Sequence, residues 1–152
     1  MKLAEALLQR KDLKTKVENL RARAVQNALV QEGDIPAEVP TELLREMNEA
    51  IEQLGVLIRR INATNNVTLL PNGTTVSDAI VQRDMLELRR LALDVVLNKA
   101  AVRQERFARN EIKFVPTIDV VAMRRESDAS AQARRELDTQ IQAVNWSADL
   151  VE

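Results

Sequence analysis

The amino-acid sequence contains neither cysteine nor histidine among its 152 residues. Without cysteine no disulfide can form, so packing alone must hold the fold together. The two absences also remove the thiol nucleophile, the imidazole base and every zinc site that needs Cys or His ligands. Any metal site would have to use oxygen ligands, which magnesium, calcium and manganese accept. The missing residue types count against an enzyme, and we expect no cofactor.

Aromatic side chains and net charge are equally scarce. The aromatic residues are Phe107, Phe114 and Trp146, which are too few to form base-stacking platforms. Lys and Arg number 22 against 23 Asp and Glu, so no overall charge attracts nucleic acid or an anionic membrane. We therefore expect no nucleic-acid partner.

Long apolar runs are missing as well. No stretch of the chain approaches the roughly 18 apolar residues of a transmembrane helix. Glu5 interrupts the apolar start of the chain, which therefore does not resemble a signal peptide. These features predict a cytoplasmic location. The length suits one domain, and we expect a single helical domain over residues 1–152.

Helical periodicity is the strongest positive signal. It recurs in four segments, at about residues 2–31, 41–64, 77–107 and 118–146. Within them, seam residues separated by alternating steps of three and four follow a heptad pattern. The first seam is Leu3, Ala6, Arg10, Leu13, Val17, Leu20, Ala24 and Asn27. The second is Leu44, Met47, Ile51, Leu54, Ile58, Ile61 and the polar Asn65. Gly55 inside the second helix predicts the close approach of a neighbouring helix.

The third and fourth segments differ from this simple pattern. The third has one apolar stripe at Val81, Met85, Leu88, Ala92, Val95 and Val102, and another at Leu86, Leu93, Leu97 and Ala100. A helix that is apolar on more than one face has neighbours on more than one side. The fourth seam is Val120, Met123, Ser127, Ser130, Arg134, Leu137, Ile141 and Val144. Its middle is unusually polar.

The connections contain the usual helix-breaking residues. Gly33, Pro36 and Pro40 place a loop between the first two helices. Residues 67–76 contain two short β-prone runs around Pro71-Asn72-Gly73, a pattern that predicts a small β-hairpin. Residues 108–117 alternate in polarity, which favours an extended segment.

Four helices of similar length joined by short connections predict an all-α fold. We expect an antiparallel four-helix bundle of long coiled-coil-like helices, with the β-hairpin between the second and third helices. An alternative is two long helical hairpins that complete their bundle with a second chain. The second apolar stripe of the third helix predicts a homo-oligomer in either case.

Short motifs spread over the whole chain resemble those of one bacterial family. They are Met1-Lys2-Leu3-Ala4-Glu5-Ala6-Leu7, Asn62-Ala63-Thr64-Asn65, Arg83-Asp84, Glu111-Ile112-Lys113-Phe114-Val115, Thr117-Ile118-Asp119-Val120, Asn145-Trp146 and Asp149-Leu150. The chain thus resembles a family of uncharacterised bacterial proteins of about its own length, some of which are named septicolysin. The resemblance implies a compact helical protein without assigned catalytic residues. The name implies a pore-forming cytolysin, but the sequence has no export signal to support it.

An up-down-up-down bundle would gather one set of polar residues at the pole that holds the hairpin and both chain ends. The members of this candidate polar cluster are Glu5, Arg10, Asn62, Asn65, Arg83, Asp84, Asn145 and Asp149. They would form either a small polar-ligand pocket or a polar layer that fixes helix register, as buried Asn does in coiled coils. We favour the polar layer. We also expect Asp84, on the inner side of the third helix, to pair with Arg10.

A weaker candidate site lies at the opposite pole. It consists of Arg103, Arg106, Arg109, Glu111, Lys113 and Asp119. Arginines one helical turn apart can bind phosphate or a carboxylate, but cations also favour a helix C-terminus, so a solvated helix end is the favoured interpretation. Ser127 and Ser130 have neither a histidine nor an activating lysine and are poor nucleophiles. Their polar seam favours a fourth helix that is partly exposed or pairs with a partner chain.

The leading functional hypothesis is a non-enzymatic, self-associating helical scaffold or interaction protein. Its basis is the heptad pattern, the balanced charge and the missing catalytic residue types. The first alternative is a small polar-ligand-binding protein or enzyme that uses the pole containing Arg83 and Asp84. The second is the pore-forming cytolysin that the family name implies. The sequence itself indicates no substrate, no ligand and no oligomer size.

Overall fold

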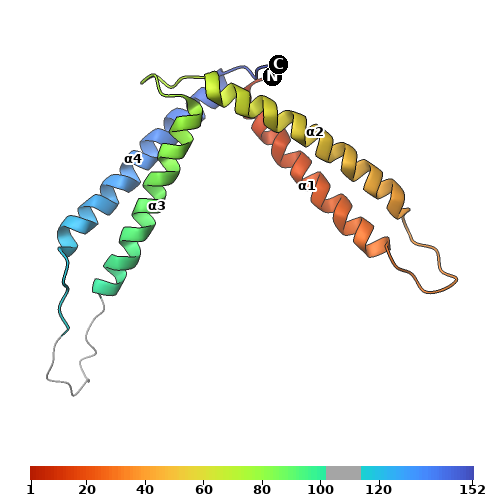
Figure 1. The fold of residues 1–152 in the computed structure, drawn as a ribbon, viewed down its shortest axis with the longest axis horizontal. Helices are drawn as coiled ribbons and strands as arrows, with labels where there is room; N and C mark the ends of the chain where they lie inside the picture. The colour runs from red at the N-terminus through yellow and green to blue at the C-terminus, as the bar shows by residue number, and fades with distance from the viewer. Residues whose placement is uncertain (102–113) are drawn as a thin grey trace. The chain divides into compact units, whose positions relative to one another are not determined.

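The computed structural model describes residues 1–101 and 114–152. Within these residues the chain forms four α-helices and no β-strand (Figure 1). The helices are α1 (Leu3–Asn27), α2 (Pro40–Val67), α3 (Val76–Ala100) and α4 (Val120–Ser147). The all-α expectation is therefore confirmed. The chain divides into two compact units, of which unit 1 is Met1–Leu69 with Gln142–Glu152 and unit 2 is Leu70–Ile141.

Local side-chain chemistry fixes the helix starts. Pro40 opens α2, where its missing N–H costs nothing and its fixed φ suits the first helical position. Thr75 caps α3, because its Oγ1 accepts a hydrogen bond of 3.0 Å from the backbone N–H of Asp78. Asp119 does the same for α4 by accepting from the N–H of Ala122 at 2.9 Å. These short polar residues set the element boundaries.

The β-hairpin expected over residues 67–76 is not present. The helices extend into it from both sides, since α2 includes Val67 and α3 begins at Val76. What remains forms a tight turn, in which Leu70 donates to the carbonyl of Thr74 at 2.8 Å and Gly73 donates to that of Leu70 at 2.9 Å. Gly73 has φ +83°, a conformation that favours glycine. The expected turn is present, but the flanking β-branched residues complete helices instead of strands.

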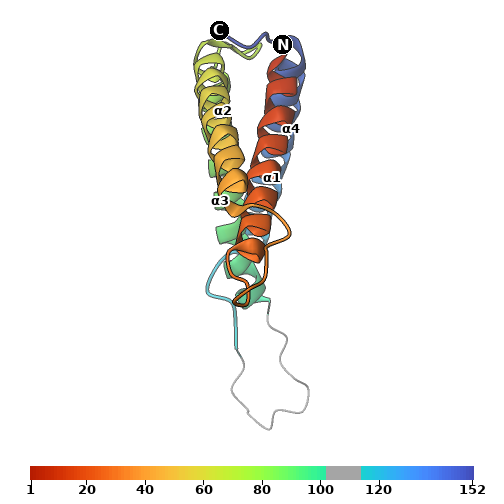
Figure 2. The ribbon, with the colours of Figure 1, turned by 90° about the vertical axis from the view of Figure 1, so that its right-hand side faces the viewer.

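Unit 1 is a helical hairpin of α1 and α2, which lie side by side (Figure 2). The start of α1 packs against the end of α2 in a cluster of Leu3, Ala6, Leu57, Ile61 and Leu150. The end of α1 packs against the start of α2 in a second cluster of Leu20, Ala24 and Leu43, with Met47 beside it. The expected α1 seam is confirmed at its apolar positions Leu3, Ala6, Leu20 and Ala24.

The expected seam of α2 is wrong by one residue at every other position. The buried residues are Leu43, Ala50, Leu57, Ile61 and Thr64, whereas Leu44 and Ile51 are 44% and 45% exposed. The two stripes are neighbours on the helix, and hydrophobicity alone favours Ile51 over the smaller Ala50. Gly55 does not mark a close helix contact either. A Cβ added there would meet only the end of the Arg59 side chain, at 3.8 Å.

Unit 2 is a second helical hairpin, formed by α3 and most of α4. Contacts join the early part of α3 to the late part of α4, and the late part of α3 to the early part of α4. Val76, Ala79, Leu97 and Ile141 are its fully buried apolar side chains in these helices. The expected α4 seam is confirmed, with Ser127 and Ser130 5% and 6% exposed. Of the two stripes of α3, the one with Leu97 is the more buried, and its other members Leu86, Leu93 and Ala100 are half-buried. The other is exposed at Val81, Met85, Leu88, Ala92 and Val95.

Candidate functional site

The two chain ends lie close together in unit 1 (Figure 1). Backbone and side-chain contacts join them. Leu3 donates to the carbonyl of Ala148, and Leu150 donates to that of Met1, each at 2.9 Å. Lys2 Nζ contacts the carbonyl of Ser147 and Asp149 Oδ1, both at 2.9 Å. The hydrogen bond from Lys2 is the first cause of a pKa for Asp149 that lies below its usual value. The arrangement ties the termini together and leaves few of these polar groups free for a ligand.

A buried threonine connects the C-terminal segment to α2. The Oγ1 of Thr64, which is 0% exposed, accepts a hydrogen bond of 2.9 Å from the N–H of Val151 and donates one of 2.8 Å to the carbonyl of Arg60. Arg60 Nε in turn donates to the carbonyl of Val151 at 2.9 Å. The sequence pattern did not predict roles for Lys2, Arg60 and Thr64. The only available signal was the place of Thr64 seven residues after Leu57, on the stripe of α2 next to the expected seam.

The candidate polar cluster is divided between the two units. In unit 1, Glu5 and Asp149 both contact Lys2, with Glu5 Oε2 accepting from the Lys2 N–H at 2.7 Å. The remaining members in unit 1 are Arg10 and Asn65, which are half-buried, Asn62, which is exposed, and Asn145, which is 5% exposed. Arg83 and Asp84 belong to unit 2.

Arg83 is held by two carboxylates of its own unit. Its guanidinium contacts Asp84 Oδ1 at 2.9 Å and Asp138 Oδ1 at 3.1 Å. Burial lowers the pKa of Arg83, but the hydrogen bonds to the two aspartates outweigh that effect and raise it. The side chain of Asp84 is 56% exposed, so the expected inner position of this residue on α3 is wrong. The sequence analysis assigned Asp84 to the side of α3 that carries Val81 and Leu88, and that side is exposed.

The seam between α3 and α4 carries charged side chains and one serine, joined by ion pairs and hydrogen bonds. Its members are Arg83, Glu87, Arg90, Asp94, Ser127, Arg134 and Asp138, which we call the ion-pair seam. Arg90 is its centre, contacting Glu87 and Asp94 at 2.7 Å each. From α4, Arg134 contacts Glu87 at 3.2 Å, and the Ser127 hydroxyl donates to Asp94 at 2.7 Å.

The carboxylate of Asp94 is held on both sides within the ion-pair seam. One of its oxygens accepts a hydrogen bond from Arg90 and the other from the Ser127 hydroxyl. The hydrogen bond from Arg90 is the first cause of a lowered pKa for Glu87, and the charges of Arg90 and Arg134 add to it. Ser127 is buried and bonds to Asp94 of α3 within the same unit, so the expectation that this part of α4 is exposed is wrong. The alternative, that α4 meets a partner chain, stays a prediction.

An apolar surface lies on the outer side of α3. We call it the α3 apolar face, and it consists of Val81, Met85, Leu88, Leu91, Ala92, Val95 and Val96. Leu88 is 60% exposed and Val95 71% exposed. Large contiguous apolar patches are uncommon on monomeric proteins and mark interaction sites. The periodicity of the sequence predicted this stripe, together with a neighbour to cover it.

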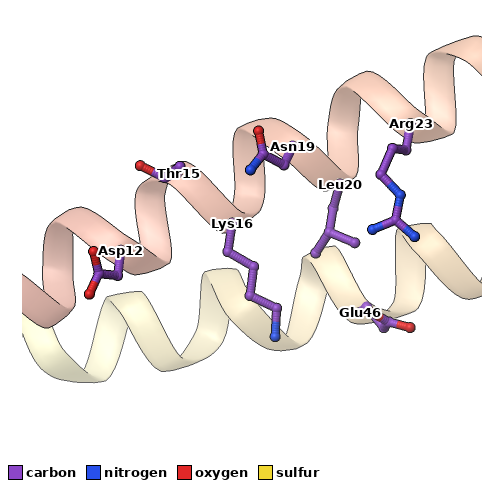
Figure 3. Close-up of a pocket in the computed structure, with 7 residues that line it drawn as sticks. All are labelled: Asp12, Thr15, Lys16, Asn19, Leu20, Arg23 and Glu46. Atoms are coloured by element: carbon purple, nitrogen blue, oxygen red, sulfur yellow. The ribbon is translucent and has the colours of Figure 1, made fainter.

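One open hollow of about 400 Å³ lies along α1 and α2 in unit 1 (Figure 3). It is lined by Asp12, Thr15, Lys16, Asn19, Leu20, Arg23 and Glu46. Lys16 and Arg23 extend from α1 toward α2, which contributes Glu46 (Figure 3). Arg23 is already bound to Glu38, with Nε donating to Oε2 at 2.9 Å, and this lowers the pKa of Glu38. Ligand sites are concave and mostly apolar with a few polar groups, and this charged, open surface lacks that character.

The weaker candidate site can be assessed at one residue only. Asp119 is the helix cap of α4, which accounts for its position. Its other members lie outside the described residues, namely Arg103, Arg106, Arg109, Glu111 and Lys113. Over the described ranges, no group of three or more acidic side chains could hold a metal ion, and no helix has the length and apolar character to cross a membrane.

Comparison with known proteins gives one family and one structure. Residues 10–150 match a family described as a family of unknown function, DUF6847. The crystal structure of a functionally unknown conserved protein from Corynebacterium diphtheriae is 40% identical, with a TM-score of 0.92 and 99% of each chain covered. No curated protein matches the chain. Neither description mentions an enzymatic activity, a ligand or the name septicolysin.

Proposed function

The chain belongs to this family of unknown function, and we propose that it is a non-enzymatic helical scaffold that associates with further copies of itself. The observation that carries the proposal is the α3 apolar face. In unit 2, Arg83, Glu87 and Asp94 of α3 contact α4, and a larger apolar stripe remains exposed on the other side of the helix. That distribution suits a helix that has a second helical neighbour.

Unit 1 has a smaller surface of the same kind. Leu44 and Ile51 of α2, two helical turns apart, are 44% and 45% exposed. A two-helix hairpin can bury only one stripe of each helix, so any second apolar stripe needs a further layer to cover it. We infer that helices of a second chain cover the exposed stripes of these antiparallel, coiled-coil-like helical hairpins, so that the four-helix assembly expected from the sequence is completed between chains and the protein is a homo-oligomer.

The polar groups give less support to a ligand-binding role. Among the described residues, no buried side-chain nitrogen or oxygen lacks a hydrogen-bond partner. An empty site for a polar ligand is expected to contain buried polar groups that have no hydrogen-bond partner within the protein. Arg83, Asp94 and Thr64 already have such partners. A single helical domain and a cytoplasmic location remain predictions that accompany the scaffold proposal.

The proposal is tested by the mass of the protein in solution. Sedimentation equilibrium should give a multiple of the 17.1 kDa chain mass at micromolar concentration, and that mass should fall on dilution. Thermal unfolding should shift to higher temperature as the protein concentration rises, because association stabilises the folded state by mass action. A constant mass of one chain across this range, with a melting temperature independent of concentration, would overturn the proposal.

A further inference from the structure

The two faces of α3 point in opposite directions. The more buried residues of α3 recur at alternating steps of three and four, and Arg83 among them contacts Asp138 of α4; they include Val76, Ala79, Arg83, Leu86, Arg90, Leu93 and Leu97. Successive helical residues turn by about 100°, so Val81 and Arg90, nine positions apart, lie on opposite sides of the helix. The ion-pair seam fixes the inner face of α3 against α4. The α3 apolar face is therefore the surface left for a further partner.

The outer face has the spacing of a coiled-coil seam. Val81, Met85, Leu88, Ala92 and Val95 follow steps of four, three, four and three. This is the a/d pattern that lets two helices pack side by side over several turns. In that pattern Val81, Leu88 and Val95 take d positions, while Met85 and Ala92 take a positions. An apolar patch that does not pack against another helix would have no reason to repeat this a/d spacing along several turns.

The charges beside the stripe indicate its partner. Asp84 borders the stripe on one side, at a g position, and Arg89 borders it on the other, at an e position. In a parallel pair of helices, a g residue faces the e residue five positions later on the partner helix. Asp84 would then face Arg89 of the second copy, and the symmetry of the pair forms this contact twice. In an antiparallel pair, g positions face g positions and e positions face e positions, so neither Asp84 nor Arg89 faces an opposite charge.

We propose that α3 pairs in parallel with α3 of a second copy through the α3 apolar face, with Asp84 and Arg89 forming ion pairs between the chains. The inference rests on the proposed self-association and specifies its surface and direction. A lipid surface is a poorer match, because one acid and one base flank the stripe, whereas helices that bind anionic membranes carry an excess of Lys and Arg.

Disulfide trapping tests the direction of pairing. The chain has no cysteine, so single substitutions give unambiguous products. In a parallel pair every seam residue meets its own copy, and Val81→Cys and Val95→Cys should each form a covalent dimer under mild oxidation. An antiparallel pair brings at most one of these positions to its own copy. Val121→Cys, at a position of α4 that is 62% exposed, is the matched control and should remain largely monomeric. Crosslinking at only one of the two test positions would overturn the parallel arrangement.

A charge in the middle of the stripe tests the surface. Leu88→Glu should weaken association by more than about 100-fold, because each chain loses a buried leucine and gains a charge in the interface. Val121→Glu places the same charge on an equally exposed apolar position and should leave the mass unchanged. Circular dichroism confirms that both variants remain helical. If the natural chain is oligomeric and Leu88→Glu keeps that mass, the α3 pairing is wrong while self-association stands; a natural chain of one-chain mass overturns both.

Two further measurements complete the test. Asp84→Arg should weaken association about fivefold, and adding Arg89→Asp should restore it, since the double exchange rebuilds the pair with the charges reversed. Flotation with vesicles of equal parts phosphatidylcholine and phosphatidylglycerol should leave the protein unbound. Binding to these vesicles that Leu88→Glu abolishes, with no self-association in solution, would assign the face to lipid and overturn the proposal.

Discussion

The two helical hairpins differ in what fills the seam between their helices. In unit 1 the seam of α1 and α2 is apolar, with Leu3 and Ile61 almost fully buried. In unit 2 the seam of α3 and α4 has Arg90 near its middle, bound to Glu87 and Asp94. Apolar burial stabilises by about 25 cal/mol per Å², whereas partly exposed ion pairs contribute about 0–1 kcal/mol each. Unit 2 therefore gains less from its own seam and has more apolar surface available for another chain.

The comparison predicts the largest loss of stability for a core truncation in unit 1. Ile61 is 1% exposed within the cluster that contains Leu3 and Leu57. Ile61→Ala should lower the free energy of unfolding by about 2–5 kcal/mol, from lost transfer energy and the cavity left behind. Val25→Ala, at a position that is 70% exposed, should change it by less than about 0.5 kcal/mol. Urea denaturation of both variants measures the difference, and equal losses would show that the unit 1 core is not tightly packed.

A polar substitution in the seam of unit 2 should have a smaller effect. Ser127→Ala removes the hydroxyl that donates to Asp94 at 2.7 Å. The expected loss is about 1–2 kcal/mol, because a hydrogen bond to a charged group is lost while the half-buried carboxylate regains some hydration. Ser147→Ala on the exposed end of α4 is the control and should be nearly neutral. A loss for Ser127→Ala as large as that for Ile61→Ala would contradict the difference between the two seams.

The ion-pair seam should also make stability depend on acid. The pKa of Glu87 is lowered in the folded protein, first by its hydrogen bond with Arg90. Ionised Glu87 therefore contributes stability above its unfolded pKa of about 4.3, and this contribution is lost as pH falls through the lower folded-state value. Urea midpoints measured between neutral and acidic pH should fall on acidification, and Glu87→Gln should flatten that fall. Glu126→Gln, at an exposed position of α4, should leave the profile of the natural chain unchanged.

A glycine in unit 1 offers a gain in stability. Gly55 lies inside α2, and an added Cβ would meet only Arg59 at ordinary contact distance. Gly55→Ala should raise the free energy of unfolding by about 0.5–1 kcal/mol, since glycine is a poor helix former and the new methyl group has room. Thermal denaturation at fixed protein concentration measures the gain. A loss instead would mean that a neighbour approaches Gly55 in the assembled protein, as the sequence pattern predicted.

The sequence predicted the four helices because each of them contains seam residues at heptad spacing. It also predicted the α4 seam, including Ser127 and Ser130, because that helix offers no competing stripe. It failed on α2, where Ala50 and Ile51 belong to adjacent stripes and the larger residue is exposed. It failed again on α3, because the charged residues Arg83 and Glu87 look like surface positions, although Asp138 and Arg134 of α4 pair with them. Pairing between distant residues decides such cases, and a periodic pattern does not contain it.

The smallest expected effect concerns Asp84, which the sequence pattern placed in a sealed polar layer. Its side chain is 56% exposed, and its ion pair within the described residues is with Arg83, which also contacts Asp138. In the Leu88→Glu background, where the proposed α3 pairing is removed, Asp84→Ala should cost less than about 0.5 kcal/mol, because water solvates the exposed face of Arg83. Asp138→Ala should cost more, since it removes the contact that joins α4 to α3. Denaturant unfolding of the two variants in that background measures the difference. A cost of about 3 kcal/mol for Asp84→Ala would instead support the sealed polar layer predicted from the sequence, with the charge of Asp84 in the interior of unit 2.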